Sequence, residues 1–205
     1  MAALRRFREP REPVRAGEVC EMCGEPLEDE HRHVVNVEQR ALMCTCRACS
    51  LLFTNPTAAQ GRYRSVPDRH LYDAAFAITD AQWDLLQIPV SMAFFFVNSI
   101  AGQTNAFYPS PAGATESLLS LETWADVTSA NRLAALLEPD VEALLVRKRD
   151  GRYECYLVPI DACYELVGLV RMNWKGFAGG AEAWQTIDDF FDRLQARSRP
   201  YTADR

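Results

Sequence analysis

The sequence predicts an α+β protein in which a small cysteine-rich module precedes a mainly antiparallel sheet packed with helices. Three observations support this fold class. Two Cys-x2-Cys pairs lie within the first fifty residues. An Asp-Gly dipeptide separates two strand-like runs in VEALLVRKRDGRYECYLVP, as in a two-residue β-hairpin. Capped and amphipathic helical segments precede and follow these strands, which indicates helices that cover a sheet.

The composition is that of a folded chain, and its turn residues divide it into four segments. Apolar residues make up 48% and charged residues 24% of the 205 residues, close to the average for globular proteins. Gly61 and Pro67 mark a connecting loop. We expect a disordered basic tail at 1–17, a four-cysteine metal-binding ribbon at 18–56, a linker at 57–70 and an α+β domain at 71–205.

The paired cysteines are the strongest signal in the chain. They are Cys20, Cys23, Cys46 and Cys49. The segment between the pairs, HRHVVNVEQRALMC, alternates well enough for a β-hairpin that turns near Gln39. A two-residue spacer lets both sulfurs of a pair reach one ion, and four thiolates provide the tetrahedral shell that zinc accepts. We therefore predict a zinc-ribbon-like knuckle module that binds one structural zinc ion.

Three further residues of this module have side chains that can bind metals. Cys44 lies two residues before Cys46, so both side chains share one face of the incoming strand. It is the alternative ligand to Cys46 or Cys49, although we favour a small core residue. His31 and His33 form an H-x-H pair on the hairpin. Because four cysteines already complete a zinc shell, we favour surface or supporting roles for both histidines.

Iron is the alternative to zinc at the cysteine pairs. A rubredoxin has the same pattern of two knuckles and moves one electron at an iron ion that four cysteine thiolates hold. Its second knuckle commonly carries proline and glycine, as in C-P-x-C-G. Here the second knuckle is CRACS. That difference favours zinc over iron.

The larger domain is predicted to begin with a capped helix and a central strand. Thr79 and Gln82 match a capping box, and the helix is expected to end before Pro89. The run VSMAFFFVN is apolar on both faces and predicts a central strand, with TNAFY as its neighbour. A second helix is expected at about 129–137, ahead of Pro139.

The C-terminal part is predicted to contain a hairpin and two helices. The Asp-Gly turn places Arg147 opposite Glu154 across the ladder, which forms an opposite-charge pair. Asp161 is a candidate N-cap for a third, buried helix that ends at about Lys175. The last helix is amphipathic, with an apolar stripe that consists of Trp184, Ile187, Phe191 and Leu194.

Charge, hydropathy and motifs limit the kinds of function that we expect for this chain. The net charge of −6 argues against a broad nucleic-acid footprint. No apolar run approaches the ~20 residues of a membrane span, and no apolar stretch of a secretion signal follows the N-terminal arginines. We therefore expect a cytoplasmic chain with reduced thiols. Because no phosphate-binding loop, nucleophile elbow or zinc-protease motif is present, we predict no catalytic residues; Cys155 and Cys163 are expected to be buried.

Several segments together resemble one bacterial protein family. They are CEMCGEP, HRHVVNVEQRALMCTCRACSLLF, GRYRSVPDRHLY and VPIDACYELVGLVRMNWKGFAGGAEAW, and they span about residues 18 to 196. This uncharacterised family, a domain of unknown function, is encoded beside actinobacterial-type nickel–iron hydrogenase genes. The resemblance implies a cytoplasmic accessory role in making, loading or serving a hydrogenase. By analogy with the rubredoxin-like proteins of other hydrogenase clusters, it also strengthens the iron alternative.

Three functional hypotheses follow. The favoured one is a non-catalytic accessory or assembly protein for a nickel–iron hydrogenase. Its structural zinc ribbon would bind a protein partner, with a hydrogenase subunit as the candidate. The second is a rubredoxin-like iron protein that carries electrons in the same system. The third is a zinc-ribbon adaptor linked to nucleic acid, which the acidic charge balance disfavours.

Overall fold

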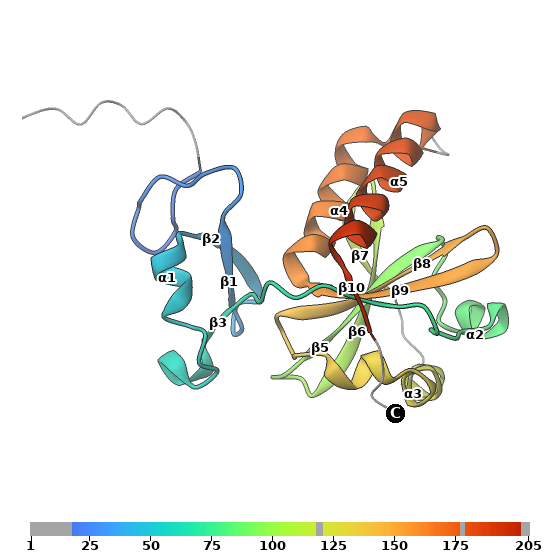
Figure 1. Ribbon diagram of the computed structural model, residues 1–205, viewed down its shortest axis with the longest axis horizontal. Coiled ribbons are helices and arrows are strands. Elements are labelled where there is room, and N and C mark those ends of the chain that lie inside the picture. The colour runs from blue at the N-terminus through green and yellow to red at the C-terminus, as the bar shows by residue number, and fades with distance from the viewer. Residues whose placement is uncertain (1–17, 118–120, 177–178, 202–205) are drawn as a thin grey trace, which may run out of the picture.

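The computed structural model describes residues 18–117, 121–176 and 179–201. The predicted basic tail at 1–17 lies outside these residues. The described chain is α+β with a mainly antiparallel sheet, as predicted. It comprises a cysteine ribbon with its own small sheet and a larger domain, which Figure 1 shows side by side. Within the described residues, no helix has the length and apolar character needed to cross a membrane.

The ribbon sheet is built on the predicted hairpin. Val34 pairs with Met43 and Val35 with Leu42, in an antiparallel register with the turn at 37–40. A third strand from the expected linker joins the other side of the hairpin, so that segment is part of the sheet. The sheet has the order β2-β1-β3, and its elements are β1 (Arg32–Asn36), β2 (Ala41–Thr45), α1 (Arg47–Leu51), the 3₁₀ segment η2 (Ala58–Gly61) and β3 (Tyr63–Ser65).

The larger domain is built on a seven-stranded sheet among the described residues. Its order is β10-β4-β9-β8-β5-β6-β7, with all neighbours antiparallel except β10 and β4. The strands are β4 (Leu71–Asp73), β5 (Met92–Asn98), β6 (Gln103–Ser110), β7 (Gly113–Ser117), β8 (Glu142–Arg149), β9 (Arg152–Pro159) and β10 (Arg199–Pro200). The VSMAFFFVN run forms β5 inside the sheet, with TNAFY in β6 beside it, as predicted.

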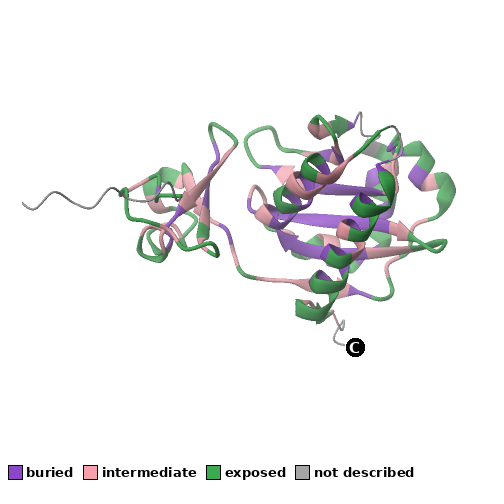
Figure 2. Ribbon diagram, turned by 90° about the horizontal axis from the view of Figure 1, so that it is seen from above, coloured by how far each residue is buried: buried purple, intermediate pink, exposed green. Residues whose placement is uncertain are grey.

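Helices cover both faces of this sheet and bury two separate cores. Strand alternation sends Phe94 to the first core and Phe95 to the second. The helices α4 and α5 cover the first core, and α2 and α3 lie on the opposite side of the sheet (Figure 1). Figure 2 shows the buried strands beneath the exposed faces of the helices. The helices are α2 (Asp80–Leu85), α3 (Leu121–Ala130), η3 (Arg132–Leu136), α4 (Ile160–Asn173) and α5 (Gly180–Arg197).

Local sequence signals place two elements correctly. The Thr79 side chain accepts the Gln82 backbone N–H, and Gln82 reaches back to the Thr79 N–H, which completes the predicted capping box of α2. The Asp-Gly turn joins β8 and β9 and places Arg147 opposite Glu154. The Arg147 guanidinium lies 3.6 Å from the Glu154 carboxylate, so the predicted charge pair forms.

Three helical predictions need correction. The helix expected at 129–137 lies earlier, at Leu121–Ala130, and its expected range is mostly the 3₁₀ segment η3. Asp161 does not cap α4: the N-cap is Pro159, and the Asp161 carboxylate binds His33 instead. Met172 is 75% exposed, so α4 is buried on one side only.

The buried stripe on α5 also differs in part from the prediction. Ile187, Phe191 and Leu194 are buried, as expected for the inner face of an amphipathic helix. Trp184 at the start of the stripe is 39% exposed. Phe190, outside the predicted stripe, is buried in its place. Because Ala183 is also buried, the inner face of α5 spans the same length as predicted but is rotated slightly about the helix axis.

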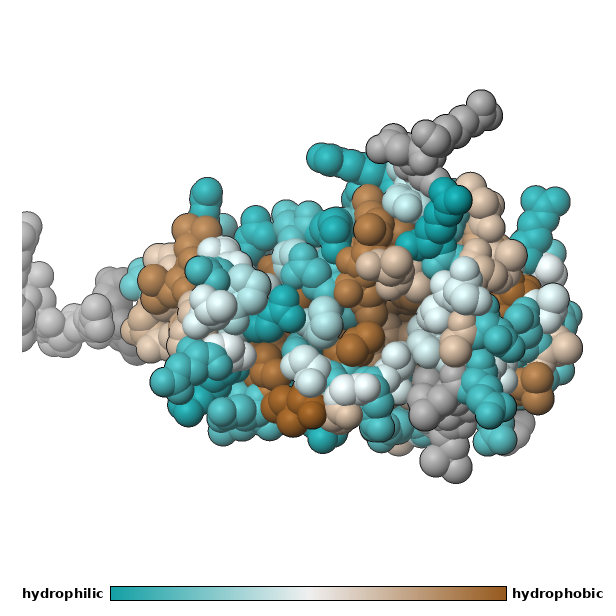
Figure 3. Space-filling view, turned by 90° about the horizontal axis from the view of Figure 1, so that it is seen from below, coloured by the Kyte–Doolittle hydropathy of each residue, from teal (hydrophilic) through white to brown (hydrophobic). Residues whose placement is uncertain are grey.

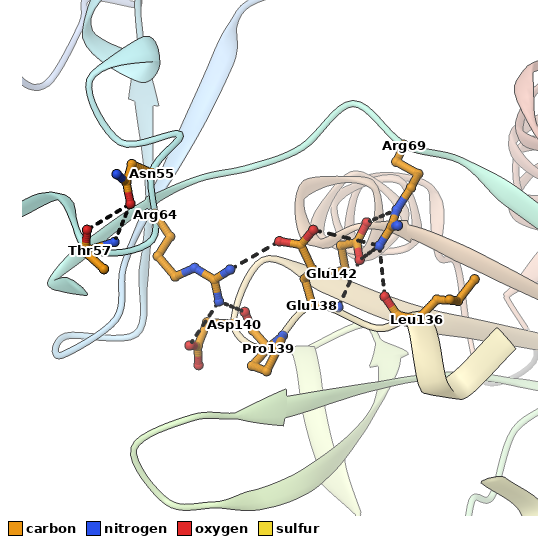
Figure 4. Close-up of polar contacts among 9 residues, drawn as sticks. All are labelled: Asn55, Thr57, Arg64, Arg69, Leu136, Glu138, Pro139, Asp140 and Glu142. Atoms are coloured by element: carbon orange, nitrogen blue, oxygen red, sulfur yellow. Dashed lines mark hydrogen bonds and ion pairs between the residues drawn. The ribbon is translucent and has the colours of Figure 1, made fainter. Parts of the chain in front are cut away.

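Apolar and charged contacts join the ribbon to the larger domain. Val35 and Val37 of the ribbon belong to the first core together with Ile160 of α4. At a second contact between the two parts, Arg64 of β3 donates to the carbonyl oxygen of Pro139 and pairs with Glu138 at 3.2 Å (Figure 4). The first core therefore continues from one sheet to the other.

Candidate metal centre

The second cysteine pair opens a short helix. Cys46 is the N-cap residue of α1, and its sulfur accepts the backbone N–H of Cys49 at 3.5 Å. The Ser50 N–H bonds to the Cys46 carbonyl at 3.0 Å. Cysteine takes the position here that serine or aspartate usually occupies, with sulfur as the acceptor. The helical turn thereby brings the side chains of Cys46 and Cys49 to the same end of α1.

The first cysteine pair lies in a tight turn. The Gly24 N–H bonds to the Cys20 carbonyl at 2.8 Å, and the Cys20 N–H bonds to the Glu25 carbonyl at 2.8 Å. Gly24 has a φ of 75°, which glycine adopts without the steric cost of a Cβ atom. The Glu21 N–H reaches the Cys44 carbonyl of β2 at 2.9 Å, so the hairpin itself positions this turn.

The structure brings the four predicted cysteines together. The sulfurs of Cys20, Cys23, Cys46 and Cys49 all lie within 4.8 Å of one another. The sulfurs of Cys23 and Cys46, from different pairs, are 3.8 Å apart. Cys20 is buried, and Cys23 is exposed. One side of the cluster therefore faces solvent.

The electrostatics of the cluster favour a bound cation. Burial raises the pKa of the Cys20 thiol, but the backbone N–H groups of Cys46, Cys23 and Met22 outweigh it and lower this pKa to about 6. Burial and the neighbouring sulfurs raise the pKa of Cys49 to about 12. The two pKa values diverge because backbone N–H groups stabilise the Cys20 thiolate, whereas burial and the neighbouring sulfurs disfavour a charge on Cys49. A bound cation stabilises thiolates and would let all four sulfurs ionise.

The donor set fits a thiolate-binding metal ion. Four sulfurs at these separations match the tetrahedral shell of zinc, or of iron in a one-iron site. Magnesium and calcium prefer oxygen ligands and do not match it. Backbone N–H groups that point at the sulfurs, such as that of Cys49, would hold the thiolates in place around the ion. The four cysteines are thus a candidate metal site.

The other predicted residues of the module lie outside this cluster. Cys44 is half-buried, and it groups with His31 and His33 rather than with the four sulfurs. Burial, followed by the nearby Glu18 and Glu21 carboxylates, raises the pKa of the Cys44 thiol. The sequence pattern pointed to each residue of this second group but not to the group itself, because the hairpin register is what joins them.

The two C-terminal cysteines are buried, as predicted. Cys155 of β9 and Cys163 of α4 are both fully buried. Burial raises the pKa of each thiol well above its usual range. Such thiols stay protonated at neutral pH and pack as small apolar side chains.

Comparison with known proteins assigns a family. The family model described as "Family of unknown function (DUF5947)" matches residues 19–198. No curated protein and no solved structure matches the chain. The family match begins next to the first cysteine pair and ends after α5, so it includes both the ribbon and the larger domain.

Proposed function

The chain belongs to DUF5947, a family of unknown function, and we propose that it is a non-catalytic accessory or assembly protein for a nickel–iron hydrogenase. In this proposal the four cysteines bind a structural zinc ion, and the zinc ribbon binds a protein partner, a hydrogenase subunit. The protein acts in the cytoplasm. The resemblance in the cysteine pairs and in the α4 segment supports the choice of hydrogenase, and the structure supports the mode of binding.

The observation that carries the proposal is an apolar surface beside the cysteine cluster. Leu51 and Leu52 lie two and three residues after Cys49 and are 58% and 66% exposed. Val19 directly precedes Cys20 and is 42% exposed. Apolar surface appears at this end of the molecule in Figure 3. Large apolar side chains that gather on a surface mark sites of protein interaction, whereas isolated ones are common. We call these three residues the knuckle patch.

A metal ion in the cluster would hold the residues of the knuckle patch in fixed positions. Leu51 ends α1, whose start is fixed by Cys46, and Val19 forms a bridge with Pro26 across the first turn. An ion that joins the two turns therefore fixes both parts of the knuckle patch relative to each other. Preformed surfaces bind more tightly because less conformational freedom is lost on association. The proposed role of zinc is thus structural.

Nucleic acid is a poorer partner for this surface. The chain has a net charge of −6, and the knuckle patch is apolar rather than basic. Binding to the phosphate backbone depends on neutralisation by lysine and arginine. A protein partner that covers leucine side chains matches the patch better.

The decisive experiment is co-purification of a tagged chain from its native cells. The wild-type protein is expected to retain a hydrogenase subunit, and the double variant Leu51→Asp/Leu52→Asp is expected to lose it. The matched control is Leu85→Asp on α2, because Leu85 is 60% exposed but belongs to the larger domain. Retention by the double variant, or equal loss in the control, contradicts the proposed surface. Wild-type protein that retains no hydrogenase subunit contradicts the proposed partner.

The exposed sulfur of Cys23 favours a second candidate, rubredoxin-like electron transfer at iron. An electron carrier needs its metal close to the surface, and Cys23 is the exposed member of the cluster. The metal distinguishes the two candidates. Four thiolates around ferric iron give a red protein with intense visible absorption that reduction bleaches, whereas the zinc protein is colourless. Elemental analysis of protein purified from its native cells decides between them.

A further inference from the structure

A large cleft lies beside the contact between the ribbon and the start of α4. Its volume is about 1040 Å³, and it is lined from both sides by charged residues and by all three histidines of the sequence. His31 and His33 come from the ribbon, and His70 from the segment that leads into the larger domain. Asp161 of α4, which contacts His33, lines the same cleft. The cleft is therefore rich in groups that bind metals, and Cys46 of the four-sulfur cluster also lines it.

Hairpin register places three metal-binding side chains together beside this cleft. His33 of β1 pairs directly with Cys44 of β2. His31 lies two residues before His33, and side chains with this spacing point to the same side of an extended chain. One ring nitrogen of each histidine and the Cys44 sulfur all lie within 4.8 Å of one another. The two imidazole rings have centroids 4.8 Å apart.

Both imidazoles are oriented through their Nδ1 atoms. His31 Nδ1 lies 2.9 Å from the carbonyl oxygen of Glu28, and His33 Nδ1 lies 2.9 Å from the Asp161 carboxylate. Since both partners are acceptors, each Nδ1 carries the proton and donates it. This leaves the Nε2 lone pairs available in the neutral rings. Histidines that bind metals through Nε2 almost always have Nδ1 held by an oxygen in this way.

One of these nitrogens is buried without a hydrogen bond. The His31 side chain is only 9% exposed, and its Nε2 atom has no hydrogen-bond partner among the described residues. This atom lies 3.4 Å from the exposed carboxylate of Glu18. A buried imidazole nitrogen without a partner carries an energetic cost that a ligand removes. This observation is independent of the clustering itself.

We propose that His31 Nε2, His33 Nε2 and Cys44 Sγ bind a second divalent transition-metal ion, separate from the four-cysteine site. Two imidazoles and one thiolate suit ions of the zinc, cobalt and nickel class and do not suit magnesium or calcium. The carboxylate of Glu18, at the surface, is close enough to supply a fourth ligand, which would be an oxygen. With only three fixed protein ligands and the cleft next to both imidazoles, this ion exchanges more readily than one inside a closed four-thiolate shell.

The second site would link the ribbon to the larger domain. Asp161 begins α4 and orients His33, a residue 128 positions away in the sequence. Glu21, between the first two cysteines, bonds to the backbone N–H and carbonyl of Cys44. Contacts to α4 and to the first cysteine turn therefore already hold two of the proposed ligand residues in place. It has a different ligand set from the four-cysteine site, and it does not depend on the hydrogenase partner proposed above.

The test uses the full chain with zinc retained in its four-cysteine site. After exposure to a mild chelator, the zinc content is measured and the protein is titrated with Co²⁺ while visible absorption is followed. The wild-type chain is expected to take up one further ion with ligand-field bands of a mixed nitrogen–sulfur site. The double variant His31→Ala/His33→Ala is expected to lose this ion. His70→Ala, which removes a histidine that lines the same cleft but lies outside the group of three, is expected to keep it.

A milder variant tests the orientation of His33. Asp161→Asn keeps a side chain of the same size but weakens the hold on Nδ1, and it is expected to lower the affinity for the second ion about 10- to 100-fold. Circular dichroism and the zinc content of the first site check that each variant folds. X-ray absorption of the second ion in the wild-type chain is decisive even where a variant fails to fold. A wild-type chain with one ion only, a second ion that the double variant retains, or an all-sulfur shell overturns the proposal.

Discussion

Arg69 holds the fully buried carboxylate of Glu142 with two hydrogen bonds. Arg69 Nε lies 2.8 Å from Oε1, and Nη2 donates to Oε2 (Figure 4). The same carboxylate accepts the backbone N–H of Glu138 at 2.9 Å. Arg69 belongs to the chain that leaves the ribbon, and Glu142 begins β8. The pair therefore fixes the connection between the ribbon and the central part of the sheet.

Removal of Arg69 should destabilise the protein strongly. Arg69→Met leaves the Glu142 charge buried without its partner, and such a loss costs about 3–5 kcal/mol of unfolding free energy. Lys175→Met is the control, because both side chains of the Lys175–Glu182 pair are exposed and such pairs contribute little to stability. Urea unfolding followed by circular dichroism measures both. If the two substitutions lowered the free energy of unfolding equally, Arg69 would contribute little to the stability of the buried Glu142 carboxylate.

Loss of the four-cysteine site should open the ribbon and leave the larger sheet folded. Structural zinc contributes roughly 10–16 kcal/mol in isolated zinc-finger peptides at neutral pH, so Cys20→Ser removes most of what holds the two turns together. Trp83 and Trp124 are buried in the second core, on the face of the sheet away from the ribbon. We expect proteolysis within 18–56 and little change in tryptophan fluorescence. A collapse of the fluorescence would mean that the ribbon and the sheet unfold together.

Two glycines should respond in opposite directions to alanine. Gly151 in the β8–β9 turn has a φ of 75°, where a Cβ atom costs about 1–2 kcal/mol, so Gly151→Ala should lower stability. Gly168 lies inside α4, and a Cβ atom built there meets nothing within 4 Å. Gly168→Ala should therefore raise stability by about 0.4–1 kcal/mol, because it restricts the unfolded chain. Thermal unfolding curves of the two variants should shift to opposite sides of the wild type.

His70 should make stability depend on pH. Burial, followed by the charge of Arg197, lowers the pKa of His70, and Asp68 and Asp161 oppose this effect. The unfolded chain, with an ordinary histidine pKa of about 6.5, then binds more protons than the folded one. The contribution of His70 is present above that pH and is lost as the pH falls towards the lower folded value. Urea unfolding at pH 7.5 and 5.5 should show a smaller loss for His70→Asn than for wild type; parallel losses would refute this role.

Local chemistry made much of the fold predictable. The capping box at Thr79 and the Asp-Gly turn between β8 and β9 depend on residues within a few positions of each other. The cysteine pairs are similar, since each knuckle is a single turn of chain. Their assembly into one cluster followed from the chemistry of thiolates, which favours one shared ion. The metal that binds there stays a prediction.

Long-range contacts explain the errors. Asp161 has the composition of a helix cap, but His33 lies close enough in space to take its carboxylate. The apolar run that ends at Leu137 resembles a helix, yet it forms η3, with Leu133 buried in the second core. The group of His31, His33 and Cys44 depends on the register of the hairpin and on the position of α4. None of these relationships is encoded within a short window of sequence.

The two-residue strand β10 protects one edge of the large sheet from pairing with another chain. The backbone N–H groups of Arg199 and Tyr201 point towards β4 and donate to the carbonyl oxygens of His70 and Tyr72. The intervening Pro200 would direct its amide outward, but proline has no N–H to offer. A further chain that approaches this edge finds a missing donor and an exposed arginine, both of which discourage strand addition. A chain truncated after residue 198 would expose β4 and should aggregate more readily.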